Sequence, residues 1–187
     1  MAKKLSEMTL EELWALFPII LKEHQPFWKD WYNEEEALLR AKLPAETVRI
    51  SHIGSTAVET IWAKPIVDIL VEMPKGYDLN SLTGALADCG FRCMSRGEGR
   101  LSFNKGYTEN GFAEKVFHLH VRYVGDNDEL YFRDWLNTHP EDAKRYETLK
   151  LELWKRYEHD RDGYTEQKTA LVREITQRAR AEYRDRY

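Results

Sequence analysis

The stretch SHIGSTAVETIWAKPIVDILVEMP, residues 51–74, decides the fold of this chain. Its second half, IVDILVEM at 66–73, is apolar at odd and even positions alike, which is typical of a central strand covered on both faces. One carboxylate, Asp68, interrupts this apolar run. Because burying an unpaired charge is costly, Asp68 either forms a salt bridge with a buried Arg or Lys, or acts as a metal ligand or general base.

A turn of one glycine and two hydroxyl residues, Gly54, Ser55 and Thr56, precedes this strand. It follows the alternating pattern TVRISHI at 47–53, which predicts a strand that ends at the turn. Glycine allows a sharp turn, and the hydroxyl and N–H groups could hold phosphate if the turn opens a helix. The alternative is an ordinary strand-to-helix turn in which Ser55 or Thr56 is the N-cap.

The rest of the chain alternates between helical and strand-like patterns. Before the quoted stretch, a capping box at Thr9 predicts a helix through Ile20, and Pro26 begins a second helix that ends before Pro44. After it, a helix from about 80 to 90 is followed by strands near 91–95, 100–105 and 115–124. From residue 127 onward only helical patterns remain, at 129–139, 141–160 and 164–186.

These patterns predict an α+β (α/β) fold with a mixed sheet flanked by helices. We expect one domain, 1–187, made of N-terminal helices at 1–44, a sheet-containing core at 45–126 and C-terminal helices at 127–187. The composition, 42% apolar and 32% charged, is that of a soluble globular protein.

Charge and cysteine content narrow the class of protein further. The formal net charge of −4 argues against general nucleic-acid binding. The two cysteines, Cys89 and Cys93, are too few for a secreted disulfide scaffold, so we expect reduced thiols. No stretch approaches the roughly 20 apolar residues of a membrane span, and no signal-peptide pattern is present. The sequence therefore predicts a cytoplasmic protein with no membrane partner.

Two histidines share one face of a predicted strand. In FHLHV, residues 117–121, His118 and His120 alternate with apolar residues that face the other way. Such a pair could bind one metal ion through two imidazoles, or present two donors to a phosphate. The alternative is a structural role in the sheet.

Three lysines lie at places where a charge could face a cleft. Lys64 precedes Pro65 at the entrance of the central strand, Lys150 lies four residues after Tyr146, and Lys168 borders the apolar face of the last helix. For Lys150 and Lys168, ammonium groups facing a dry cleft suit a polyphosphate, whereas stems lying along the core edge are the competing explanation. For Lys64 the alternative is a solvated lysine. We expect another charged pair, Arg133 and Asp134, to bridge a helix to the sheet.

Six blocks of the sequence together resemble the GrpB family: HIGSTAV, AKPIVDILVE, FHLHV, YFRDWL, Y..LK and YTEQK, between about residues 48 and 175. Members of this family resemble the nucleotidyltransferases related to DNA polymerase beta. The resemblance implies a nucleotidyltransferase fold, in which Gly54 and Ser55 hold the nucleotide phosphates and Asp68 is the first of two metal-binding acids. It also implies a third acid on a later strand, whose place His118 or His120 could take.

The chain departs from that pattern at Leu70, where the second acid is expected. Residues i and i+2 of a strand lie on one face about 6.6 to 6.8 Å apart, a spacing from which two carboxylates can hold metals ~3.5 to 4 Å apart. Glu72 shares that face but lies ~13 Å along the strand from Asp68, so we expect a strand-end carboxylate there. The two-metal chemistry of the superfamily therefore does not carry over intact.

The sequence thus favours a nucleotidyltransferase-like protein that binds a nucleoside triphosphate, with possible transfer to a hydroxyl of an unknown acceptor. Asp68 is the predicted catalytic residue, and with His120 it would hold Mg²⁺, or Mn²⁺ or Zn²⁺ as alternatives. The predicted nucleotide-binding residues are Gly54, Ser55, Thr56, Lys64, His118, Lys150 and Lys168. Three alternatives stay open: an inactive nucleotide- or anion-binding module, a metal-dependent hydrolase that uses Asp68 with His118 and His120, and a structural domain in which Asp68 is salt-bridged.

Overall fold

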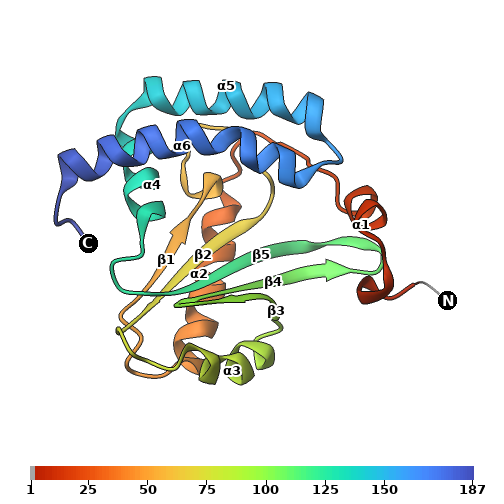
Figure 1. Cartoon of the computed structure of the whole chain (residues 1–187), viewed down its shortest axis with the longest axis vertical. Helices are drawn as coiled ribbons and strands as arrows, with labels where there is room; N and C mark the ends of the chain where they lie inside the picture. The colour runs from red at the N-terminus through yellow and green to blue at the C-terminus, as the bar shows by residue number, and fades with distance from the viewer. Residues whose placement is uncertain (1–2) are drawn as a thin grey trace.

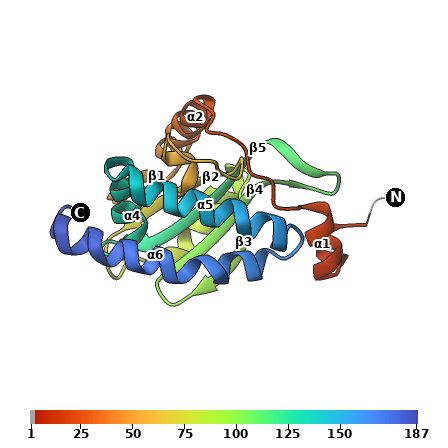
Figure 2. The ribbon, with the colours of Figure 1, turned by 90° about the horizontal axis from the view of Figure 1, so that it is seen from above.

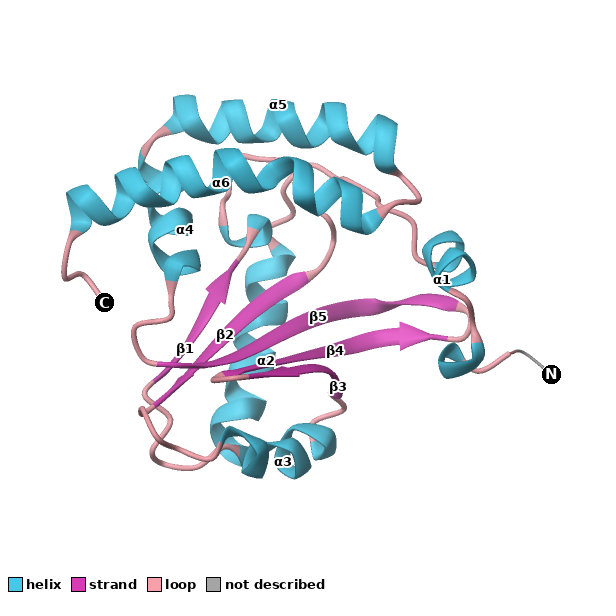
Figure 3. Ribbon diagram, viewed as in Figure 1, coloured by secondary structure: helices cyan, strands magenta, loops and turns pink. Residues whose placement is uncertain are grey.

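The computed structural model describes residues 3–187; the first two residues of the predicted 1–187 domain lie outside this part. Within it, strands form one five-stranded sheet in the order β1-β2-β5-β4-β3 (Figure 1). The strands are β1 Arg49–Ile53, β2 Val67–Met73, β3 Arg92–Gly97, β4 Arg100–Thr108 and β5 Gly111–Tyr123. The α-helices are α1 Leu10–Leu16, α2 Phe27–Lys42, α3 Thr83–Asp88, α4 Asp128–Thr138, α5 Pro140–Tyr157 and α6 Arg161–Tyr183. The predicted α+β class with a mixed sheet is confirmed (Figure 3).

The central strand is β2, as its apolar pattern predicts. It pairs antiparallel with β1 and parallel with β5, so that Asp68 lies opposite Ile53 on one side and His118 on the other. Ile69 and Leu70 point to opposite faces, and both are fully buried. Both faces of β2 are therefore covered, which explains why the strand is apolar at nearly every position.

The helices form two groups around the sheet. Figures 1 and 2 show α2 against one face of the sheet, and α5 and α6 on the opposite side. The main core lies between the sheet and α2 and α3, and a second apolar cluster joins α4, α5 and α6. No helix of residues 3–187 combines the length and apolarity that crossing a bilayer requires. The space between the sheet and the C-terminal helices is where the predicted site residues meet.

The N-terminal half differs from the prediction at one helix end. The first helix stops at Leu16 instead of continuing through Ile20, because Pro18 disfavours helical backbone at Phe17. Residues 18–25, which we call the strap, then run without helical structure to the start of α2. The strap crosses the molecule beside α5 and becomes a wall of the cavities described below.

Two further predicted helix starts take a tighter form. The helix expected from about residue 80 begins as a 3₁₀ turn, Leu79–Leu82, which Asp78 caps by accepting a hydrogen bond from the N–H of Asn80 at 3.0 Å. The turn after Gly54 opens a single 3₁₀ turn, Ser55–Ala57, and not an α-helix. The expected phosphate cradle at an α-helix N-terminus is therefore absent from this turn.

Candidate functional site

A cavity of about 390 Å³ lies between the sheet and helices α5 and α6. We call it the cation cavity, because basic side chains outnumber acidic ones on its walls. Its polar lining consists of Gly54, Ser55, Thr56, Lys64, Asp68, His118, His120, Tyr146, Lys150, Arg161, Asp162, Tyr164, Thr165 and Lys168. All the residues predicted from the sequence as nucleotide or metal ligands therefore line one space, although they come from five separate parts of the chain.

Asp68 opens into this cavity beside the glycine turn. Its side chain is 27% exposed, and among the described residues its ion-pair partners within 4.0 Å are histidines, not Arg or Lys. Gly54 has φ +71°, and a Cβ built there would lie 2.9 Å from Cγ of Asp68. Glycine is thus required at position 54 for two reasons: the backbone conformation and the close approach of the carboxylate. The salt bridge to a buried guanidinium or ammonium, one of the alternatives for Asp68, is not formed.

A chain of hydrogen bonds fixes His118 against Asp68. Nδ1 of His118 lies 3.2 Å from Oδ1 of Asp68, and Nε2 lies 2.7 Å from the hydroxyl of Tyr107. The guanidinium of Arg161 donates to that hydroxyl at 3.1 Å. Since the hydroxyl accepts from Arg161, it is free to donate to Nε2, which leaves the Nδ1 proton of His118 for Asp68. Both ring nitrogens of His118 are therefore engaged.

The carboxylate of Asp68 is held in its charged form. Burial raises its pKa, but the hydrogen bonds and positive potential of His118 and His120 act in the opposite direction and outweigh it. The pKa of Asp68 therefore lies well below its usual range. His120 contributes from a greater distance, with Nε2 4.0 Å from Oδ1 of Asp68.

The residues present do not fit the two-metal centre that the nucleotidyltransferase pattern implies. Leu70 is fully buried and packs with Ile53 and Leu130, so the position of the missing acid does not face the cavity. Within residues 3–187, no group of three or more His, Cys, Asp or Glu side chains is arranged to hold a metal ion. His118 is engaged by Tyr107 and Asp68, and the other possible metal donors on the cavity lining are Asp68, His120 and Asp162, which are not arranged as a group.

Two other charged groups of the sequence analysis lie outside the cavity. Glu72 is fully buried at the end of β2, where it accepts a hydrogen bond from Asn127 at 2.9 Å and lies 3.2 Å from Nε of Arg49. Arg133 donates to the carbonyl of His52 at 2.8 Å and thereby ties α4 to β1, the bridge we expected. Both groups stabilise the fold and have no contact with the candidate site.

Three lysines approach the cavity from different elements. Lys150 of α5 is almost fully buried; it donates to the hydroxyl of Ser55 at 3.1 Å and to the carbonyl of Trp62. The ammonium groups of Lys64 and Lys168 lie 4.5 and 4.3 Å from the ring centre of Tyr164. The ring of Tyr164 thus makes cation–π contacts with both Lys64 and Lys168. Lys150 connects α5 to the glycine turn through its bond to Ser55.

Burial and the crowding of positive charge lower the pKa of two lysines of the cavity. Burial lowers the pKa of Lys64 to about 7, and repulsion from Lys168 and Arg161 contributes to the shift. Burial, together with Lys168, lowers the pKa of Lys150 to about 7 as well. Two ammonium groups are therefore poised to lose their protons near neutral pH unless an anion enters the cavity.

Sequence reasoning missed Arg161, Tyr107 and Tyr164. A signal for Arg161 was present in HDRDG at 159–163, because Asp160 caps α6 through the N–H of Gly163 at 2.8 Å and so places Arg161 in the first turn. Thr56 lines the cavity, but its hydroxyl lies 3.3 Å from the carbonyl of Ile66, to which it donates. That hydroxyl therefore holds the turn in place.

Comparisons with known proteins agree with the resemblance in the sequence. The family model described as "GrpB protein" matches residues 18–178. A UPF0157 protein of Pseudomonas aeruginosa is 37% identical over 159 residues, which cover 83% of this chain and 65% of that protein. The glutamate-rich protein GrpB of Alkalihalophilus pseudofirmus is 36% identical over 163 residues, which cover 84% of this chain and 93% of that protein. The chain thus spans slightly less than two thirds of the Pseudomonas relative and nearly all of the second.

Solved structures give the same picture of the fold. The conserved protein GrpB of Enterococcus faecalis superposes with a TM-score of 0.76 at 28% identity, covering 88% of this chain and 99% of that chain. A structure of the Cid1 poly(U) polymerase bound to MgATP superposes with a TM-score of 0.50 at 14% identity, covering 72% of this chain and 43% of that chain. At that identity the second match concerns the fold alone, which is nucleotidyltransferase-like.

Proposed function

The chain belongs to the GrpB family, and from this premise we propose that its cation cavity binds the polyphosphate of a nucleoside triphosphate. One observation carries the proposal: Lys64, Lys150, Lys168 and Arg161 converge on a single cavity that holds only two acidic side chains. Such a cluster repels itself, and a bound polyphosphate would offset the repulsion. The nucleotidyltransferase-like fold favours a nucleotide over other anions as the source of those phosphates.

Lys150 and Lys168 have distinct parts in this proposal. Lys150 is preorganised by its bonds to Ser55 and Trp62, so it would contact phosphate with little loss of side-chain freedom. Lys168 makes no hydrogen bond within the described residues and lies over the Tyr164 ring, so its three N–H donors are available. Asp68 would repel a bare phosphate, and the Mg²⁺ dependence of binding therefore tests whether this carboxylate takes part.

Binding is better supported than the other candidate activities. Transfer of a nucleotidyl group by two metal ions needs a second carboxylate, and Leu70 occupies that position inside an apolar cluster. A hydrolase with one metal ion on Asp68, His118 and His120 would require His118 to give up its bond to Asp68 or Tyr107. Nucleotidyl transfer stays the second candidate function, because the carboxylate of Asp68 is accessible from the cavity.

Titration calorimetry tests the proposal directly. ATP, CTP, GTP, UTP and inorganic triphosphate are titrated into the protein with and without Mg²⁺, and pyrophosphate release is followed in parallel. Loss of one charge-assisted phosphate contact weakens binding by about tenfold or more, which is the effect expected for Lys168→Gln. Lys155→Gln is the matched control, because Lys155 lies exposed on α5 away from the cavity. Equal affinity of the two variants, or absence of heat with every phosphate, would refute the proposal.

A further inference from the structure

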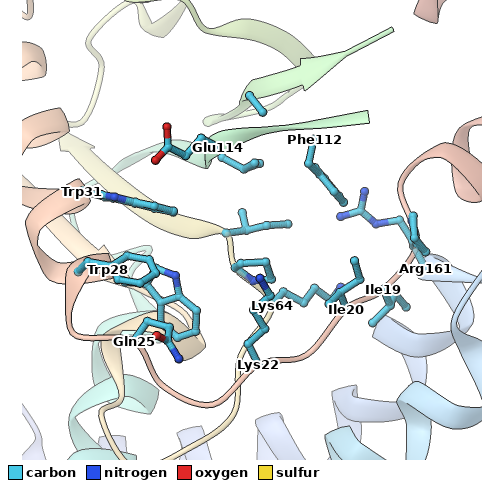
Figure 4. Close-up of a pocket in the computed structure, with 16 residues that line it drawn as sticks. Ile19, Ile20, Lys22, Gln25, Trp28, Trp31, Lys64, Phe112, Glu114 and Arg161 are labelled. Carbon is cyan, nitrogen blue, oxygen red and sulfur yellow. The ribbon is translucent and has the colours of Figure 1, made fainter. Parts of the chain in front are cut away.

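A second cavity, of about 440 Å³, lies beside the cation cavity. We call it the aromatic groove. Its apolar walls include Ile20 of the strap, Phe27, Trp28 and Trp31 at the start of α2, and Phe112 at the start of β5. Figure 4 shows Trp28 and Trp31 on one side of the groove, Phe112 and Arg161 on the other, and Lys64 between them. Its volume suits one drug-sized molecule.

The groove keeps apolar side chains in contact with solvent. Ile20 is 38% exposed and Phe27 is 43% exposed. Phe27 stacks at a tilt on Trp31, with ring centres 4.9 Å apart. An exposed cluster of large apolar side chains that faces a cavity is typical of a binding site.

The strap that forms one wall is fixed at two points. The N–H of Ile19 donates to the carbonyl of Glu158 at 2.8 Å, and Lys22 exchanges two backbone hydrogen bonds with Ala63 at 2.8 and 2.9 Å. Ile20 lies between these anchors, so its position does not depend on a ligand. A groove held open in this way loses little entropy on binding.

The two cavities share part of their walls. Lys64, Ile66 and Arg161 line both the aromatic groove and the cation cavity. The charged side chains of the groove are Lys22, Lys64 and Arg161 against the single acid Glu114. The aromatic groove is thus lined mostly by apolar side chains, and it is positively charged where it meets the cation cavity.

We propose that the aromatic groove binds a small aromatic or aliphatic anion, with its apolar part against Ile20, Phe27 and Trp31 and its phosphate, sulfonate or carboxylate against Lys64 and Arg161. This inference rests on the proposed function in one respect: the anion would be the second molecule, bound beside the triphosphate in the cation cavity. The same charges would repel a polycationic acceptor, and the groove is too small for a nucleic-acid duplex. One buried donor favours a ligand with an acceptor atom, because the indole N–H of fully buried Trp28 has no hydrogen-bond partner among residues 3–187.

A matched pair of fluorescent dyes tests the inference on the intact chain. The anionic probe is 1-anilinonaphthalene-8-sulfonate, and its neutral analogue N-phenyl-1-naphthylamine has the same rings without the sulfonate. Phe27→Ser should weaken binding of the anionic dye by about five- to tenfold, since an aromatic contact and its buried area are lost. Leu38→Ser is the control, because Leu38 lies on the same helix, is 36% exposed and does not line the groove.

The positive charge of Lys64, which lines both the aromatic groove and the cation cavity, is tested separately. Lys64→Gln should lower the affinity for the anionic dye and leave that for the neutral dye nearly unchanged. Phe27→Ser should retain inorganic triphosphate binding, so failure of the groove is distinguishable from failure of the cation cavity. Dye binding that follows these expectations without any triphosphate binding would support the groove and refute the proposed function. Equal dye affinity in Phe27→Ser and Leu38→Ser, or an equal effect of Lys64→Gln on both dyes, would overturn the inference.

Discussion

Replacing Gly54 by alanine should destabilise the protein far more than the loss of one glycine usually does. The residue has φ +71° and ψ −173°, a region that is essentially restricted to glycine and costs other residues about 1 to 3 kcal/mol. In addition, the new Cβ would overlap the carboxylate of Asp68, with Cγ at 2.9 Å and Cβ at 3.0 Å. Overpacking of this kind costs about 1 to 3 kcal/mol, so we expect a total loss of about 4 kcal/mol.

Urea unfolding of a double-mutant cycle separates the two contributions. Gly76→Ala serves as the backbone control, because Gly76 also has positive φ, +84°, but a Cβ there would meet no atom within 4 Å. Gly54→Ala is then made in an Asp68→Ala background, where the carboxylate has been removed. Most of the steric part, about 2 kcal/mol, should disappear in that background, because only the contact with Cβ of residue 68 at 3.0 Å is left, whereas the backbone part should remain.

The reasoning fails if Gly54→Ala and Gly76→Ala cost the same free energy of unfolding. It also fails if Gly54→Ala is equally destabilising with and without the carboxylate, because the turn would then have no close contact with Asp68. A coupling energy near zero between positions 54 and 68 would thus remove the geometric basis of the candidate site.

Three further predictions concern other parts of the site. The folded-state pKa of Lys150, about 7, lies below the unfolded value of 10.5, so the unfolded state binds more protons in that window and stability should rise with pH through it. Lys150→Met should remove up to about 1.4 kcal/mol of this rise per pH unit, measured by urea unfolding at both ends of the window. Tyr107→Phe should cost about 1 kcal/mol and leave Nε2 of His118 without its hydrogen-bond donor, a change that ¹⁵N NMR of the imidazole detects as a shift of the Nε2 resonance; an unchanged Nε2 resonance would contradict the proposed hydrogen-bond chain. Leu70→Asp should destabilise the protein by several kcal/mol and create no Mn²⁺ site by calorimetry, because the new carboxylate would lie in an apolar cluster.

Much of the fold follows from local patterns. The run around Asp68 predicts β2 and its two-sided burial correctly, because a parallel neighbour and helices on both faces bury every position of the strand except Asp68. Alternation places His118 and His120 on the cavity side of β5 for the same geometric reason. The end of α1 was predicted too late, since the helical spacing of Phe17 and Ile20 ignores the effect of Pro18 on the residue before it.

The site was less predictable where it depends on contacts between distant segments. Lys150 looks like a residue at the edge of an amphipathic helix, and its bond to Ser55, 95 positions away, follows only from how α5 packs. The family resemblance implies an acid at the position of Leu70, but it does not show that Leu130 and Ile53 cover that position. Arg161 was missed because a charged residue next to a helix cap is ordinarily solvated. Sequence spacing predicts which residues share a face of one helix or strand. The environments of Lys150, Leu70 and Arg161 depend on contacts between segments that are distant in the sequence.

The hydrogen bond between Lys150 and Ser55 has a consequence for the folding of the newly synthesised chain. During synthesis on the ribosome, Asp68 and the histidines of β5 emerge long before α5 and α6, which supply Lys150, Arg161 and Lys168. A growing chain therefore carries Asp68, the histidines and Lys64 without the other three basic residues of the cavity, so the proposed polyphosphate site is incomplete until the last helix docks. Any such ligand would select finished molecules over incomplete ones and draw the final folding step toward completion.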